Sequence, residues 1–279
     1  MEIKDLSGIS QPATELIKRI SDALGSLLQP WQMRRIARAQ TDVDQIMAES
    51  QIKISEIEQR GINRLIKEEG RRQNNIESIT AQALPLLSPD ARPDEVDIDW
   101  IVHFFDRCRL VSDIEMQTVW ANLLAGESNN PKQFSKRTID LISTLDKTDA
   151  EIFTKICPFI WKIGNEPFLI IPDVNESDYM KSGIDYSAMK HLEDIGLLSI
   201  STISPYGYRG ITPTTSISYF DKRCSVWAGA AGQSLSLGSA LLSRSGQQLS
   251  RLVSCEPSEQ YYVSIVAEWH RRGHFVKKL

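Results

Sequence analysis

Apolar positions repeat with a helical period through the N-terminal and central parts of the chain. In residues 14–28, leucine and isoleucine recur at steps of three and four residues, and Thr14 stands where a helix cap is expected. The pattern predicts an amphipathic helix whose apolar face includes Leu16, Ile20 and Leu24.

A second helical segment follows Pro30 and combines an apolar stripe with clustered arginines. Its distinctive side chains are Trp31, Arg34, Arg35 and Arg38. Three interpretations fit this pairing: an ordinary packed helix, a contact in an oligomer, or a helix lying on a membrane surface. Ordinary packing is the simplest of the three.

Residues 41–84 contain no proline and carry a short heptad-like seam. The apolar or small residues of the seam are Val43, Met47, Ser50, Ile54, Ile57 and Gly61. These steps of four and three residues predict a long, coiled-coil-like helix that pairs either with its own chain or with a second copy. Three prolines in residues 85–97 then interrupt the pattern, because the residue before a proline disfavours helix. We therefore place a domain boundary between residues 92 and 93.

The central region is a predicted bundle of three or four helices with a dense apolar load. The first helix runs from Asp97 or Asp99 to Arg109. The next begins at Ser112, which has the capping-box spacing to Glu115, and Gly126 is its expected end.

The C-terminal region has the element order of a winged-helix module. Residues 148–161 and 185–195 are its candidate paired helices, and strands are expected after Gly196 and in residues 214–228. Residues 236–275 are predicted to supply two further helices and a solvated basic tail. The apolar residues that dock the first helix are Leu241, Leu242, Leu249, Leu252 and Val253, and those that dock the second are Tyr261, Val263, Ile265, Val266 and Trp269.

The resulting fold class is mainly α, with a long N-terminal helical segment, a central helical bundle and a C-terminal winged-helix-like α+β module. Its predicted domains are residues 1–92 and residues 93–279. The candidate recognition helix carries more acidic than basic side chains, which is unfavourable in a phosphate-lined groove. Nucleic acid is therefore a disfavoured partner.

Composition narrows the function classes further. The chain has 279 residues, of which 41% are hydrophobic and 24% charged, and a formal net charge of -4. This balance gives no overall attraction to nucleic acid or to an anionic membrane. The four cysteines are too widely spaced for a metal knuckle and are expected to be reduced and buried. With no signal-peptide pattern and no long apolar run, a soluble, cytoplasmic protein is predicted.

Catalytic motifs are missing from the sequence. It contains no phosphate loop, no dinucleotide-binding glycine pattern, no nucleophile elbow and no zinc-protease motif. His270 and His274 have a spacing that can chelate a metal on a helix, but Gly273 lies between them, and a solvated tail explains them more simply. We therefore expect no catalytic site, no cofactor and no metal. The candidate interaction residues are Leu16, Ile20, Leu24, Trp31, Arg34, Arg35, Arg38, Val43, Met47, Ile54 and Ile57.

Three segments carry a resemblance to a known family. They are WANLLAGE (Trp120 to Glu127), PKQFSKRTIDLISTLDKTDAEIF (residues 131–153) and MKHLEDIGLL (Met189 to Leu198). With them, residues 95–200 resemble the bacterial family called "domain of unknown function 2806" and, more distantly, the abortive-infection alpha family. The motifs are core-packing motifs, so the resemblance implies a shared fold and transfers no catalytic residue. The more distant resemblance implies a role in phage resistance.

These observations favour a non-enzymatic interaction protein that binds itself or a partner protein, in an antiphage or stress-response system. Two alternatives stay open. One is a winged-helix regulator that binds nucleic acid, and the other is a membrane-active effector that uses the N-terminal amphipathic helix.

Overall fold

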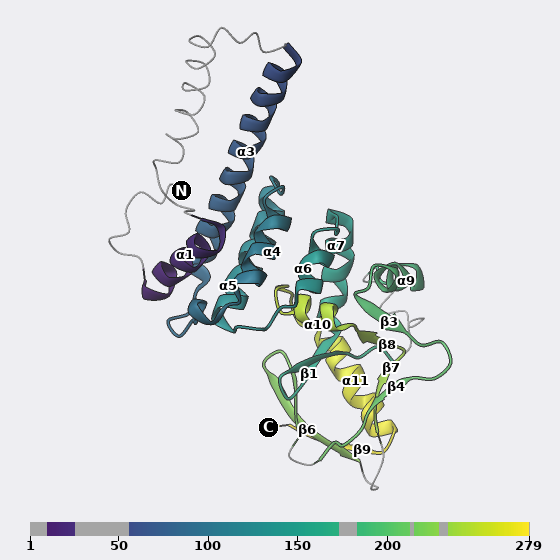
Figure 1. Cartoon of the computed structure of the whole chain (residues 1–279). Coiled ribbons are helices and arrows are strands. Elements are labelled where there is room, and N and C mark those ends of the chain that lie inside the picture. Colours follow the sequence, from purple (N-terminus) through teal and green to yellow (C-terminus); the bar gives the residue numbers. More distant parts are fainter. Residues whose placement is uncertain (1–9, 26–55, 173–182, 213–214, 229–233, 279) are drawn as a thin grey trace. The chain divides into compact units, whose positions relative to one another are not determined.

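The computed structural model describes residues 10–25, 56–172, 183–212, 215–228 and 234–278. The chain forms two compact units, Met1–Ser143 and Thr144–Leu279, which are described separately below (Figure 1). The predicted boundary between residues 92 and 93 falls inside the first unit.

The described part of the N-terminal unit is helical. Its elements are α1 (Gln11–Leu24), α3 (Glu56–Ala83), α4 (Ile98–Cys108), α5 (Ile114–Asn129) and α6 (Lys136–Ile142), with 3-10 turns η1 (Leu84–Leu86) and η2 (Pro93–Glu95). Helix α5 packs along α3, while α1 and α6 pack on α4. Phe104 and Trp120 are fully buried at the centre of this bundle, with their rings 5.3 Å apart edge to face.

Local capping explains where these helices begin. The Asp97 side chain accepts a hydrogen bond from Trp100 N, as expected for an N-cap. Two predicted caps are wrong by a few residues. Helix α1 is capped by Ser10 instead of Thr14, with a proline in its first turn, and α5 is capped by Asp113 instead of Ser112.

Gly126 does not end α5, which continues to Asn129. The glycine is needed for packing, because a Cβ atom at this position would lie 2.8 Å from Cε2 of Phe134. The predicted helix end is therefore a point of close approach between α5 and the loop that follows it.

The C-terminal unit is built on an antiparallel sheet of order β2-β1-β5-β6-β9. Its strands are β1 (Ile160–Ile163), β2 (Glu166–Leu169), β5 (Ser216–Tyr219), β6 (Lys222–Ala228) and β9 (His274–Lys278). Two small sheets pair β3 (Leu198–Ile200) with β8 (Ala240–Leu242) and β4 (Tyr206–Tyr208) with β7 (Leu235–Gly238). The helices are α7 (Lys147–Ile156), α9 (Tyr186–Asp194), α10 (Arg244–Ser250) and α11 (Glu259–Arg271), with 3-10 turn η3 (Cys157–Phe159).

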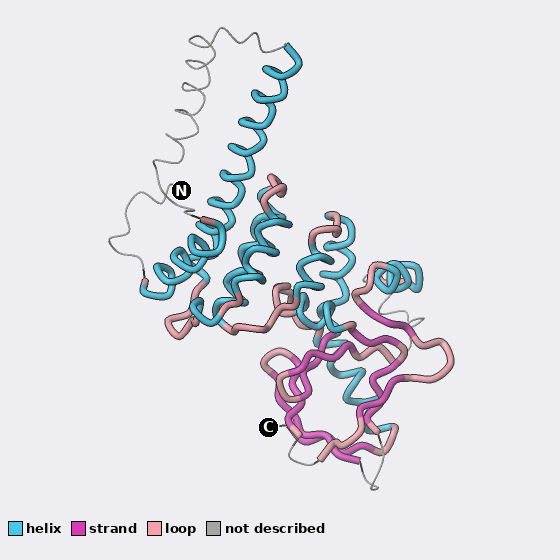
Figure 2. Tube along the Cα trace, viewed as in Figure 1, coloured by secondary structure: helices cyan, strands magenta, loops and turns pink. Residues whose placement is uncertain are grey.

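The mainly α, winged-helix fold class is wrong: the protein is mixed α+β. Among the described residues, the strands all lie in the C-terminal unit (Figure 2). The two strands expected to form the wing belong to different sheets, since β3 pairs with β8 whereas β5 pairs with β1 and β6. Leu241 and Leu242, predicted to lie on a docked helix, belong to β8, and the predicted solvated tail forms β9.

An aromatic core joins the large sheet to α11. The rings of Tyr219, Tyr262 and Trp269 lie 4.9, 5.6 and 4.8 Å from that of Trp161. Trp161 Nε1 donates a hydrogen bond to the hydroxyl of Tyr261 at 3.0 Å. Because this buried indole N–H has a partner, the cluster combines apolar burial with a satisfied polar network.

Candidate functional site

The structure describes only part of the predicted interaction set. Seven members lie outside the described residues: Trp31, Arg34, Arg35, Arg38, Val43, Met47 and Ile54. The other four, Leu16, Ile20, Leu24 and Ile57, fall on α1 and α3.

The apolar face of α1 belongs to the core of the N-terminal unit. Leu16 and Ile20 are fully buried and Leu24 is half-buried. The guanidinium of Arg19 fixes the helix by donating from Nε and Nη2 to the carbonyl of Val96, at 3.0 and 2.8 Å. Because Leu16 and Ile20 are fully buried, neither side chain can contact a membrane in this arrangement.

Helix α3 reaches well past the bundle on which its C-terminal half packs. Ile79 and Ala83 are buried on the side that faces α5, whereas residues 56–74 extend beyond the turn joining α4 to α5 (Figure 1). We call residues 56–74 the projecting half of α3. At 1.5 Å per residue it is about 28 Å long.

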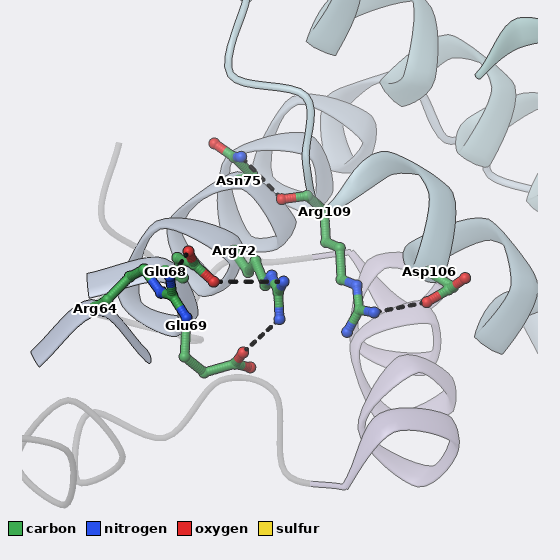
Figure 3. Close-up of polar contacts among 7 residues, drawn as sticks. All are labelled: Arg64, Glu68, Glu69, Arg72, Asn75, Asp106 and Arg109. Carbon is green, nitrogen blue, oxygen red and sulfur yellow. Dashed lines mark hydrogen bonds and ion pairs between the residues drawn. The ribbon is translucent and has the colours of Figure 1, made fainter. Parts of the chain in front are cut away.

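A polar cluster marks the base of the projecting half (Figure 3). Asn75 Nδ2 donates to the carbonyl of Arg109 at 2.9 Å and to Ser112 Oγ at 3.2 Å, which ties α3 to the turn. Gln117 Nε2 from α5 donates to Asn75 Oδ1 at 3.2 Å. The buried Asn75 amide thus has hydrogen-bond partners both in the α4–α5 turn and on α5. These bonds mark the point along α3 beyond which the helix projects from the bundle.

Ion pairs lie next to this polar cluster, on α3 and at the end of α4. Arg72 pairs with Glu69 at 3.3 Å and with Glu68 at 4.0 Å, and Arg109 Nη2 donates to Asp106 at 2.8 Å (Figure 3). The pairs on α3 are partly exposed, so each contributes little to stability. Along α3, Arg72 lies between the buried Ile79 and the exposed Leu65.

The exposed continuation is apolar. Leu65, Arg72 and Ile79 are spaced seven residues apart and therefore share one face of the helix, which Ile57 and Gly61 extend toward the N-terminus. The side that packs inward at Ile79 is open above the base, where Ile57 is 73% and Leu65 61% exposed. The seam predicted from the sequence ends at Gly61 because its next step of three residues falls on the charged Arg64, and it therefore misses Leu65.

The turn between α4 and α5 adds two more exposed apolar side chains. Leu110 is 56% and Ile114 75% exposed. They lie on the turn that Asn75 holds against α3. We call the set Ile57, Gly61, Leu65, Leu110 and Ile114 the α3 surface.

The described residues show no group of three or more side chains suited to a metal ion. His270 is exposed near the end of α11 and His274 begins β9 after a turn, so the two histidines do not share a helix face. Cys108, Cys157 and Cys224 are buried free thiols, and burial raises the pKa of each. Cys255 is only half-buried, contrary to expectation. No described helix is long and apolar enough to span a membrane.

The motif WANLLAGE packs in the core, and its last residue binds the loop that follows α5. Its Glu127 is 2% exposed and accepts hydrogen bonds from the backbone N–H groups of Lys132 and Phe134, at 2.6 and 2.8 Å. Burial raises the pKa of Glu127, and these backbone donors oppose the shift. The carboxylate therefore holds the loop after α5 in place.

The other two motifs meet in the C-terminal unit. Asp149 of α7 accepts a hydrogen bond from His191 Nε2 of α9 at 2.6 Å, and its second oxygen accepts from Asp146 N. Glu193 of α9 accepts from Ile200 N at 2.7 Å, which ties the helix to β3. The polar residues of these motifs thus connect elements of the fold.

The fold and the α3 surface define a two-unit α+β protein in which a long helix projects from a helical bundle and the sequence motifs maintain the fold. The chain belongs to the family described as "Protein of unknown function (DUF2806)", whose model matches residues 59–266. No curated protein and no solved structure matches the chain.

The Asp149 contact predicts a pH-dependent contribution to stability. Burial would raise the pKa of Asp149, but the His191 hydrogen bond, the Asp146 backbone N–H and the charge of His191 together lower it. A lowered carboxyl pKa gives stability that is present above the usual value of about 3.9 and is lost as the pH falls through the folded-state value. The destabilisation caused by Asp149→Ala should therefore be largest near neutral pH and shrink below about pH 4.

Urea denaturation at a series of pH values would measure this change. Asp221→Ala, in an exposed turn of the same unit, is the matched control and should show little effect at any pH. An Asp149→Ala penalty that stays constant down to about pH 3 would contradict the assignment.

Proposed function

We propose that this chain is a non-enzymatic interaction protein that associates with a second copy of itself through the α3 surface. The observation that carries the proposal is the exposed apolar continuation of a helix face that is buried farther along, at Ile57 and Leu65. An isolated helix of this length is marginal in water, so packing against another element would stabilise the projecting half.

A second copy suits this face because the face can pair with itself. If two projecting halves cross antiparallel at Gly61, Ile57 of each copy lies against Leu65 of the other, as a two-fold interface requires. Among the described residues, none has an atom within 4 Å of a Cβ atom added at Gly61, so none of them explains the missing side chain. Glycine at a crossing point lets two helices approach closely.

The size of the surface sets the expected affinity. A stable interface buries about 1,200–2,000 Å² in total, which two crossing helices of about 28 Å do not reach by their central residues alone. The association is therefore expected to be weak and dependent on concentration, with Leu110 and Ile114 adding apolar area near the base.

The test is light scattering coupled to size-exclusion chromatography, over a series of concentrations of the full chain. Wild type should shift from monomer to dimer as concentration rises, and Leu65→Glu should raise the dissociation constant at least about tenfold, since it places a charge at the interface. Asn63→Glu adds the same charge to the opposite face and should leave the dissociation constant unchanged.

Two outcomes would overturn the proposed surface: a wild type that stays monomeric at every concentration, or a dimer that Leu65→Glu does not weaken. Far-UV circular dichroism distinguishes lost association from lost helix. Leu65 is largely exposed and glutamate is a good helix former, so the variant should retain its helical signal.

We place this association in a bacterial antiphage or stress-response system. The support is the distant resemblance of residues 95–200 to the abortive-infection alpha family, together with a sequence that lacks catalytic motifs. A host expressing the wild-type chain should yield fewer phage plaques than a host expressing Leu65→Glu. Equal plaque counts for wild type, Leu65→Glu and an empty host would remove the antiphage role.

A further inference from the structure

A hollow of about 620 Å³ lies in the C-terminal unit, apart from the α3 surface. It is lined by Pro205, Tyr206, Gly207, Arg209, Ser234, Ser236, Arg272 and His274. Strands β4 and β7 form one side, where Gly207 is paired with Ser236. Arg272, which follows α11, and His274, the first residue of β9, also line the hollow. We call this hollow the arginine pocket.

The described side chains that line the arginine pocket carry a net positive charge. None of its described lining residues is a carboxylate, and Arg209 forms no ion pair with another described residue. Arg272 Nε donates to Glu268 Oε1 at 2.5 Å, but Glu268 also pairs with Arg271. One carboxylate thus faces two guanidinium groups, which leaves one positive charge uncompensated, and Arg209 adds another.

Hydrogen-bonding groups accompany the two arginines. Ser236 of β7 and Ser234, which directly precedes β7, bring hydroxyl groups, and His274, only 6% exposed, brings an imidazole. Burial and the charge of Arg272 lower the pKa of His274, so the ring is neutral at neutral pH. Two guanidinium groups and two hydroxyl groups that line one pocket match the oxygens of a phosphate group.

Gly207 keeps the β4 side of the pocket open. A Cβ atom there would lie 2.9 Å from Ser234 Oγ and 3.2 Å from Ser234 Cβ, so the Ser234 side chain would have to shift. Its φ is not in the left-handed region, so the backbone conformation does not demand a glycine. Because Gly207 has no side chain, space remains beside the Ser234 hydroxyl.

We propose that the arginine pocket binds a small molecule carrying a phosphate group, with Arg209 and Arg272 holding the phosphate from two sides. The volume falls within the range of about 300–1,000 Å³ that is typical of small-molecule sites. An extended polyanion fits less well, because the whole chain carries a net charge of -4. This site is independent of the proposed association through α3.

The experiment is a calorimetric titration of the full chain with inorganic pyrophosphate at constant ionic strength. Wild type should show saturable binding, and Arg209→Ala should raise the dissociation constant about tenfold or more, as expected for a lost charge-assisted hydrogen bond. Arg272→Lys should bind more tightly than Arg272→Ala, since it retains the charge. Arg223→Ala, an exposed arginine in β6, is the matched control and should bind like wild type.

Gly207→Ala provides a second variant that removes no charge. Its added methyl group should weaken pyrophosphate binding by narrowing the pocket beside Ser234. The proposal fails if wild type shows no saturable binding, or if Arg209→Ala binds as tightly as wild type. It also fails if a single-stranded oligonucleotide binds more tightly than pyrophosphate and depends on Arg209, because the ligand would then be a nucleic acid.

Discussion

Replacing Glu127 with alanine should lower the free energy of unfolding of the N-terminal unit by about 2–4 kcal/mol. The substitution removes the acceptor for the N–H groups of Lys132 and Phe134, and the latter is buried. Buried donors without partners cost about 1–3 kcal/mol each. Lys132 also has a φ of 71°, a left-handed conformation that the hydrogen bonds to Glu127 help to stabilise.

Calorimetry together with hydrogen exchange of residues 130–142 would measure this loss where it occurs. Glu127→Gln keeps the shape but turns one acceptor into a donor, so it should lie between wild type and Glu127→Ala. The control is Glu151→Ala, which removes an exposed carboxylate from α7. If Glu127→Ala leaves both the unfolding temperature and the hydrogen exchange of the loop unchanged, the hydrogen bonds of Glu127 do not contribute to stability.

Local patterns in the sequence predicted the described helices of the N-terminal unit, with errors of a few residues at their ends. Asp97 before an apolar stripe is a capping signal that requires no knowledge of distant residues, and α4 begins where it indicates. Gly126 was misassigned because a glycine after an apolar stripe usually ends a helix. Its actual role depends on the ring of Phe134, which only the fold brings near.

The sheet of the C-terminal unit could not be predicted in the same way. Strand β9 consists of residues that resemble a charged tail, and it forms because Trp227 of β6 pairs with Phe275, far along the chain. Short strands of three to five residues, such as β3 and β9, carry little periodicity of their own. Their partners decide whether they are strands, and register between distant segments is not readable from local pattern.

The same reasoning explains the outcome for the candidate site. The apolar seam led to Ile57, whose exposure the structure shows, but Leu65 could be added only after the level of the base was known. The arginine pocket was missed altogether. Its residues come from β4 and β7, from residues that flank these two strands, and from the start of β9 with the turn before it, so no spacing in the sequence relates them.

Replacing Trp161 with alanine should lower the free energy of unfolding of the C-terminal unit by about 3–5 kcal/mol. The ring is fully buried and contacts aromatic side chains from both β5 and α11, so the cavity cannot collapse easily. Trp227→Ala is the matched control: that ring is half-buried and stacked on Phe275 at 5.6 Å. It should lose clearly less stability, and equal losses would show that Trp161 is not central to the core.

A double-mutant cycle can separate the contribution of the hydrogen bond between Trp161 and Tyr261 from that of the aromatic packing. The Tyr261 hydroxyl accepts from Trp161 Nε1 and donates to the carbonyl of Ile170 at 2.6 Å, so Tyr261→Phe leaves an indole N–H and a carbonyl without their partner. Trp161→Phe removes that N–H in advance. The two substitutions together should therefore cost less than the sum of their separate effects, by about 0.5–3 kcal/mol. Strict additivity in urea unfolding would mean that packing alone stabilises the contact between β1 and α11.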